Sequence, residues 1–119
     1  MSSFRALYKV GGVVSAYNTA MGYDAGYNTT TGTNNVFIGT SSGYTNSTGS
    51  GNIFLGYQAG YNETRSNRLY IANSNTFPII YGVMPNDTLR FHARYLHLDT
   101  LSTDSVVASG HIRVNGTGL

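Results

Sequence analysis

Three consecutive stretches of the chain repeat one pattern with a strict period of 17 residues. They are Tyr17–Gly26, Asn34–Gly43 and Gly51–Gly60, and each has asparagine at its second position and a turn-like glycine at its tenth. A fixed period with glycine at fixed phases predicts a solenoid, in which every repeat forms one coil stacked on the last. The predicted turn glycines are Gly22, Gly26, Gly39, Gly43, Gly56 and Gly60.

The composition predicts an all-β chain with many tight turns. The 119 residues are enough for one domain, and only 10% of them are charged, whereas glycine occurs 15 times and tyrosine 10 times. Glycine supplies turns, and tyrosine is favoured in strands. No segment has a convincing helical pattern, so short strands joined by turns are expected throughout.

The repeats divide the chain into three segments. Residues 1–16 are expected to form short strands that dock the molecule, and residues 17–76 are expected to form a parallel β-roll. This second segment ends with a degenerate fourth copy at Arg68–Ala72, displaced by 16 residues instead of 17. The C-terminal β segment, 77–119, is expected to hold strands at 77–84, 89–101, 105–108 and 111–114, with a turn at 85–88.

The strand within each repeat carries apolar side chains on both faces. In the second repeat, Val36 and Ile38 point to one side and Phe37 to the other. A strand that is buried on both faces needs a covering layer on each side. The corresponding residues of all the later repeats, which we expect to form the core ladder and the interface between chains, are Val36, Phe37, Ile38, Ile53, Phe54, Leu55, Leu69, Tyr70 and Ile71.

The phenylalanine side of these strands has two possible covers. Left open, a ladder of Phe37, Phe54 and Tyr70 would expose roughly several hundred Å² of apolar surface, which soluble monomers seldom tolerate. Other copies of the same chain are the expected cover, because little of this chain remains to supply one. The alternative is that the C-terminal strands fold back over the ladder within one chain.

The repeats resemble those of a known family of trimeric proteins. Residues 35–43 and 52–64 are similar to head repeats of trimeric autotransporter adhesins, and more so to related repeats in bacteriophage tail fibres. Ser66–Thr76 resembles the segment that closes such blocks. Over residues 17–76, the resemblance implies a left-handed parallel β-roll and a homotrimer whose apolar strand residues fill the roll and the axial interface.

The same resemblance implies a structural function. A bacteriophage virion protein is expected, most simply a trimeric capsid decoration (cement or head-fibre) protein on the outer surface of the particle, bound to the major capsid protein or another virion protein. The start at Met1 and the lack of a long shaft favour decoration. The 17-residue period is longer than that of typical adhesin repeats. The alternatives are a tail-fibre or spike module that binds a host receptor, and a fragment of a trimeric bacterial adhesin.

The side chains also indicate which partners other than protein are expected. A host-surface glycan is a possible partner, since tyrosines of the repeats could stack on sugars, although packing at a coil edge is their commoner role. These tyrosines are Tyr23, Tyr27, Tyr44, Tyr57 and Tyr61. The chain has no basic run and no apolar stretch of about 18 residues, so neither nucleic-acid binding nor membrane insertion is expected.

No sequence pattern predicts an enzyme. The chain has no cysteine, and His92 and His97 belong to no catalytic or metal-binding motif. We therefore expect no catalytic residue, cofactor or metal. The column Asn18, Asn35 and Asn52 is expected to form a ladder instead, with each side-chain amide bonded to the next coil.

Overall fold

The computed structural model describes residues 6–7, 17–97 and 99, and within these it is an all-β protein, as predicted. Six strands form a single sheet in the order β1-β2-β3-β4-β5-β6. The elements are β1 (Thr19–Met21), β2 (Val36–Ile38), β3 (Ile53–Leu55), β4 (Arg68–Ile71), β5 (Ile80–Val83), the 3-10 helix η1 (Met84–Asn86) and β6 (Thr88–Phe91).

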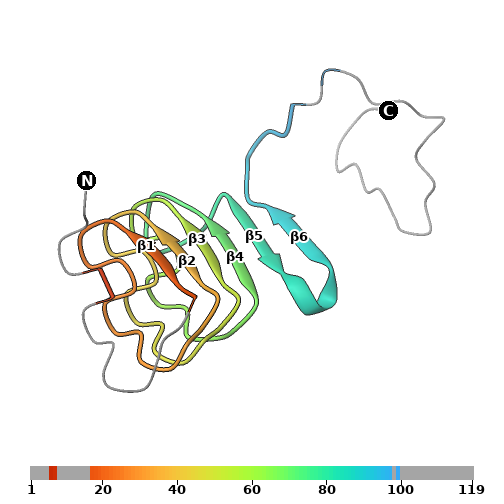
Figure 1. Cartoon of the computed structure of the whole chain (residues 1–119). Coiled ribbons are helices and arrows are strands. Elements are labelled where there is room, and N and C mark those ends of the chain that lie inside the picture. The colour runs from red at the N-terminus through yellow and green to blue at the C-terminus, as the bar shows by residue number, and fades with distance from the viewer. Residues whose placement is uncertain (1–5, 8–16, 98, 100–119) are drawn as a thin grey trace.

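The sheet is mixed, because its two halves are connected differently. Strands β1 to β4 pair in parallel, and each strand is aligned with the same position of the next repeat, so Thr19 faces Val36 and Val36 faces Ile53. Between β3 and β4 the step is 16 residues, with Phe54 opposite Tyr70, which confirms the residue dropped from the fourth copy. Strands β5 and β6 then pair antiparallel and project beyond β4 as a hairpin (Figure 1).

The predicted asparagine ladder is confirmed. The backbone N–H of Asn35 donates to Asn18 Oδ1, that of Asn52 to Asn35 Oδ1 and that of Arg68 to Asn52 Oδ1, each at 2.9 Å. The amide nitrogen of Asn35 also donates to the Gly49 carbonyl oxygen at 2.8 Å. Since Asn35 and Asn52 are fully buried and every buried amide group needs a partner, this column holds neighbouring repeats in register.

The glycines allow neighbouring repeats to approach closely. Gly39 has a φ of 127°, and a Cβ there would collide with the carbonyl group of Gly56 in the next repeat. Gly43 has a φ of 63°, and its Cβ would lie 2.6 Å from the ring of Phe37. All six predicted turn glycines have positive φ values. Ala72 takes the corresponding place after β4 with a negative φ, which marks where the chain leaves the repeat.

The C-terminal hairpin is shorter and more exposed than expected. Strand β6 ends at Phe91 rather than running through residues 89–101, and its Leu89 and Phe91 are about half exposed (54% and 49%) instead of half-buried on one side. The reason is that β6 pairs only with β5 among the described residues, so no layer covers it. The strands expected at 105–108 and 111–114 lie outside the described residues, and of those expected before residue 17 only Ala6 and Leu7 are described, where they form a turn instead of a strand.

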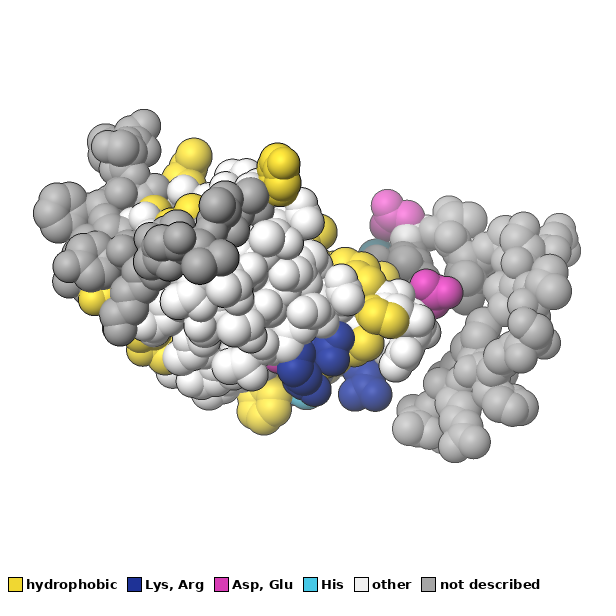
Figure 2. Space-filling model, turned by 60° about the horizontal axis from the view of Figure 1, so that its bottom comes forward, with side chains coloured by type: hydrophobic (Ala, Val, Ile, Leu, Met, Phe, Trp, Pro, Cys, Tyr) yellow, Lys and Arg dark blue, Asp and Glu magenta, His cyan; other side chains and the backbone are white. Residues whose placement is uncertain are grey.

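The surface of the repeats carries few charges. In Figure 2 most of the described surface over the repeats is neither charged nor apolar, whereas arginine side chains gather near the C-terminal end of the stack, beside exposed apolar ones. This distribution follows from loops made largely of Asn, Thr, Ser and Gly. The chemically varied part of the molecule is therefore the region around β4 and the hairpin.

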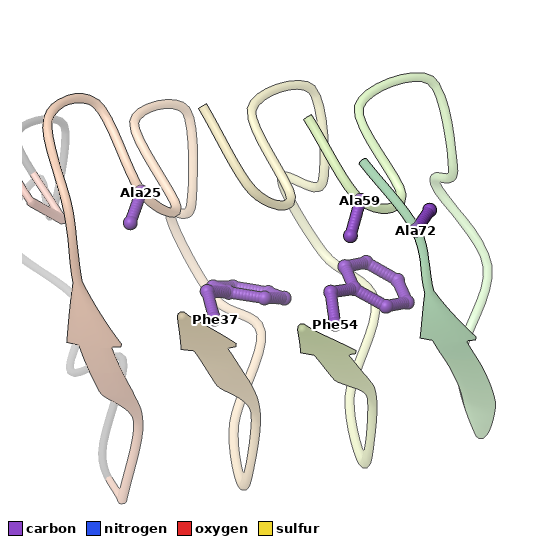
Figure 3. Close-up of a cluster of buried hydrophobic side chains, with 5 residues drawn as sticks. All are labelled: Ala25, Phe37, Phe54, Ala59 and Ala72. Carbon is purple, nitrogen blue, oxygen red and sulfur yellow. The ribbon is translucent and has the colours of Figure 1, made fainter. Parts of the chain in front are cut away.

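The hydrophobic core lies inside the repeats. Phe37 and Phe54 are fully buried, with ring centroids 5.3 Å apart, and Ala25, Ala59 and Ala72 complete the cluster. Figure 3 shows both phenylalanine side chains projecting from their strands on the same side, with Ala59 lying directly over the Phe54 ring.

This core corrects the expected role of the phenylalanine ladder. It is not an exposed surface, and neither other copies nor the C-terminal strands cover Phe37 and Phe54. The covering layer is the returning segment of each repeat, because Gly43 and Gly60 leave room for the backbone to pass directly against the rings. Tyr70, at the end of the ladder, is only partly buried and meets Phe54 edge-on at 5.2 Å.

Candidate functional site

The face of the sheet opposite the phenylalanines is largely apolar over all six strands. Residues that are directly paired in neighbouring strands point to the same side of a sheet, so the registers define two rows of outward side chains. One row is Thr19, Val36, Ile53, Leu69, Gly82 and Leu89. The other row is Met21, Ile38, Leu55, Ile71, Ile80 and Phe91. We call these two rows the outer face.

The outer face remains accessible in the single chain. Met21 is 54% exposed, Ile38 39% and Ile53 37%. Towards the hairpin an apolar hollow of about 640 Å³ opens between Leu55, Ile71 and Ile79. None of the positions in the two rows is charged, and together they expose roughly several hundred Å² of apolar surface, a size of patch that often marks an interaction site.

The structure divides the predicted interface residues between two faces. Six of them lie on the outer face: Val36, Ile38, Ile53, Leu55, Leu69 and Ile71. Phe37, Phe54 and Tyr70 lie on the inner face. Sequence reasoning missed Met21, Ile80, Leu89 and Phe91, although the apolar positions 89 and 91 within an alternating segment were a usable signal.

A buried acid is held at the end of the last full repeat. The carboxylate of Glu63 accepts 2.8 Å hydrogen bonds from Nε and Nη2 of Arg65, and a 2.9 Å bond from the hydroxyl of Tyr70. The Arg65 backbone N–H also donates to it at 2.9 Å. Glu63 follows Thr29 and Asn46 at the 17-residue step, and both of these also bond to a neighbouring segment, so the acid continues a structural column.

These contacts change the ionisation of the cluster. Burial alone would raise the pKa of Glu63, but the hydrogen bonds from Arg65 and Tyr70 outweigh it and lower the pKa to about 2. The hydrogen bond to Glu63 raises the pKa of Arg65 further. Burial, and then the bond to Glu63, raise the pKa of the Tyr70 hydroxyl. The pair is therefore ionised at neutral pH, and Tyr70 is protonated.

The Glu63 cluster predicts an acid-sensitive contribution to stability. A folded-state pKa of about 2, against an ordinary value of 4.5, stabilises the fold above pH 4.5, and this contribution is lost as the pH falls towards 2. We expect it to reach at most about 3 kcal/mol of unfolding free energy. Urea denaturation of the wild type and Glu63→Gln from pH 7 to pH 2 measures it. The variant should lose most of the slope between pH 4.5 and pH 2, and equal slopes would contradict the assignment.

The acidic and histidine side chains of the described residues lie apart from one another, except for the pair His97 and Asp99. Within them, no three His, Asp or Glu side chains come together, and no helix has the length and apolarity to span a membrane. His92 stacks on Phe77 with centroids 5.2 Å apart, and His97 lies 3.4 Å from Asp99, where both side chains are largely exposed.

The tyrosines proposed as sugar platforms fall into two groups. Tyr27, Tyr44 and Tyr61 stack on one another and are half-buried, so they mainly support the repeats. Tyr23 and Tyr57 are about half exposed. Packing at the edge of the coils, the commoner role expected from the sequence, therefore accounts for three of the five tyrosines.

Comparison of the chain with protein-family models, with curated proteins and with solved structures finds no significant match, so the function of the outer face has to be inferred from its own chemistry.

Proposed function

We propose that this chain is a non-enzymatic structural protein that assembles as a homotrimer through the outer face. The observation that carries the proposal is the uncharged and largely apolar surface of the two rows, which runs over all six strands and which no described segment covers. Burying such a surface contributes about 25 cal/mol per Å², or roughly several kcal/mol for each chain.

We further propose that residues 17–76 form a left-handed β-roll whose flat side turns towards a threefold axis. The parallel pairing of equivalent residues and the returning segments packed on Phe37 and Phe54 support the roll. When three chains turn their apolar faces towards a common axis, all three faces are buried and no apolar face is left to bind a fourth chain. Such a closed trimer stops growing, whereas an open arrangement of the same contacts would continue into fibres. The repeat resemblance implies the same arrangement.

The biological role proposed is decoration of a bacteriophage capsid. A trimer of this kind would sit on the outside of the particle and dock on the major capsid protein or another virion protein. A tail-fibre or receptor-binding role is the second candidate, and a polar hollow beside Tyr61 favours it. Labelling virions of the encoding virus with antibody against this chain separates the two, because label on the capsid supports decoration and label confined to the tail rejects it.

Assembly can be tested by placing a charge on the outer face. Ile53→Asp should convert the trimer to a monomer, because three carboxylates would be buried near the axis at a cost of about 3–5 kcal/mol each. Size-exclusion chromatography with light scattering measures the mass, and circular dichroism checks the fold. Thr40→Asp is the control, since Thr40 is exposed, lies just after Gly39 and belongs to neither row.

Two outcomes would overturn the assembly proposal. One is a wild-type protein that stays monomeric at micromolar concentration. The other is an Ile53→Asp variant that remains trimeric, which would mean that the chains meet through a different surface.

A further inference from the structure

The stack of tyrosine rings ends at a polar hollow. Tyr27 and Tyr44 lie 5.1 Å apart at an interplanar angle of 4°, and Tyr44 and Tyr61 lie 4.9 Å apart at 2°. At the 16-residue step of the fourth copy the equivalent position is Phe77, whose ring stacks on His92 instead of on Tyr61. Among the described residues, therefore, one face of the Tyr61 ring is stacked and no further ring follows on the other.

The hollow next to Tyr61 has the size and lining of a small polar binding site. It measures about 210 Å³ and is bounded by the last full repeat and by the segment that follows β4. Its walls combine one aromatic platform with hydroxyl, amide and guanidinium groups. The lining residues used below are Tyr61, Arg65, Tyr70, Asn75 and Thr76.

The charges in this hollow balance. Glu63 is buried and bonded through both oxygens, and Arg65 engages it through Nε and Nη2. Nη1 of Arg65 makes no hydrogen bond to another described residue, and the Arg65 side chain is 62% exposed. The hollow thus offers donors held in place by an ion pair but no net charge, which suits an uncharged ligand with many hydroxyl groups.

We propose that this hollow binds an uncharged hexopyranose. The apolar C–H face of the sugar lies on the Tyr61 ring, where it takes the place of a fourth ring in the stack, and its hydroxyl groups bond to Arg65 Nη1, Asn75 and Thr76. Tyrosine suits this role because it presents a rigid apolar face with little conformational entropy to lose. The neighbouring hollow of about 310 Å³ shares Tyr70 and Thr76 and has room for the next sugar of an oligosaccharide.

Sugar binding would be separable from self-association. Tyr70 belongs to the inner row of the sheet, opposite the outer face, and no residue lining the sugar hollow belongs to either outward row. A variant of the hollow is therefore expected to keep the oligomeric state of the wild type, so failure of the sugar proposal and failure of the trimer proposal can be told apart.

Saturation-transfer NMR with methyl glycosides of glucose, galactose, mannose and N-acetylglucosamine tests the site. At least one should receive saturation, strongest on the ring protons of one face. Tyr61→Ala should weaken its binding at least about tenfold. Tyr57→Ala is the matched control, because Tyr57 is exposed in the same repeat but does not line the hollow, and it should bind like the wild type.

Two further variants keep the test decisive if Tyr61→Ala does not fold. Tyr61→Phe keeps the ring and should retain binding, whereas Asn75→Ala, on an exposed segment, should weaken it several-fold. Absence of saturation for every glycoside at tens of millimolar would overturn the proposal. So would unchanged binding in a folded Tyr61→Ala or Asn75→Ala. Binding of acidic sugars alone, abolished by Arg90→Gln, would move the site to the neighbouring hollow and also overturn it.

Discussion

Replacing Phe54 with alanine is expected to lower the free energy of unfolding by about 3–5 kcal/mol, the cost of emptying a fully buried aromatic site. Phe54 sits between Phe37 and Tyr70, with ring centroids 5.3 Å and 5.2 Å away, so its removal interrupts the whole inner ladder. Little of that space can be refilled, because the backbone of Gly60 already lies against the ring. A loss of this size is a large part of the stability of a small domain.

Chemical denaturation of Phe54→Ala beside Tyr57→Ala measures this effect. The control removes an exposed aromatic side chain three residues away and should change the unfolding free energy by less than about 0.5 kcal/mol. Phe54→Asp should give no folded protein, since it would place an unpaired charge in the core of each repeat. A folded, monomeric Phe54→Asp would show that the ring belongs to a contact between chains after all.

Gly39→Ala is expected to destabilise the protein by at least about 3 kcal/mol. Two costs combine at this position. Alanine at a φ of 127° is strained by about 1–3 kcal/mol, and its Cβ would force apart two repeats at the Gly56 carbonyl, which costs about as much again. Because the collision is with backbone, no side chain can turn away to relieve it.

Thermal unfolding of Gly39→Ala, Thr40→Ala and Ala72→Gly compares these positions. Thr40 is the exposed neighbour of Gly39, and Ala72 occupies the same phase after β4, where no further repeat follows. Both control variants should lose no more than about 1 kcal/mol. If Gly39→Ala melts within a degree or two of Thr40→Ala, the repeats are farther apart than the structure has them.

The period allowed much of the sheet to be predicted. Equal spacing of Asn18, Asn35 and Asn52 implies that equivalent residues lie side by side, and this one inference yields the all-β class, the parallel register and the buried amide column. The shortened step to Arg68 was visible in the same way. These features depend only on the spacing of equivalent residues along the chain, and that spacing can be read from the sequence.

Other features depend on how a repeat folds back on itself, and these were not predictable. Alternation shows that Phe37 and Ile38 face opposite ways, but it does not say which side the returning segment covers. That choice is made by Gly43, whose missing side chain admits the Phe37 ring. The pairing of β4 with β5 likewise depends on a reversal of the chain between Ala72 and Ile80, for which no repeat provides a template.

The asparagine column has a consequence for how such a molecule changes length. Each internal asparagine accepts from the following repeat and is itself contacted by the preceding one, so any repeat presents the same two surfaces as its neighbours. A whole unit of 17 residues inserted between β2 and β3 would meet partners identical to those already there. It would carry the hairpin outward by about 4.8 Å, the spacing of adjacent strands. The length of the molecule can therefore change by one whole repeat at a time, while the first repeat and the hairpin stay unchanged.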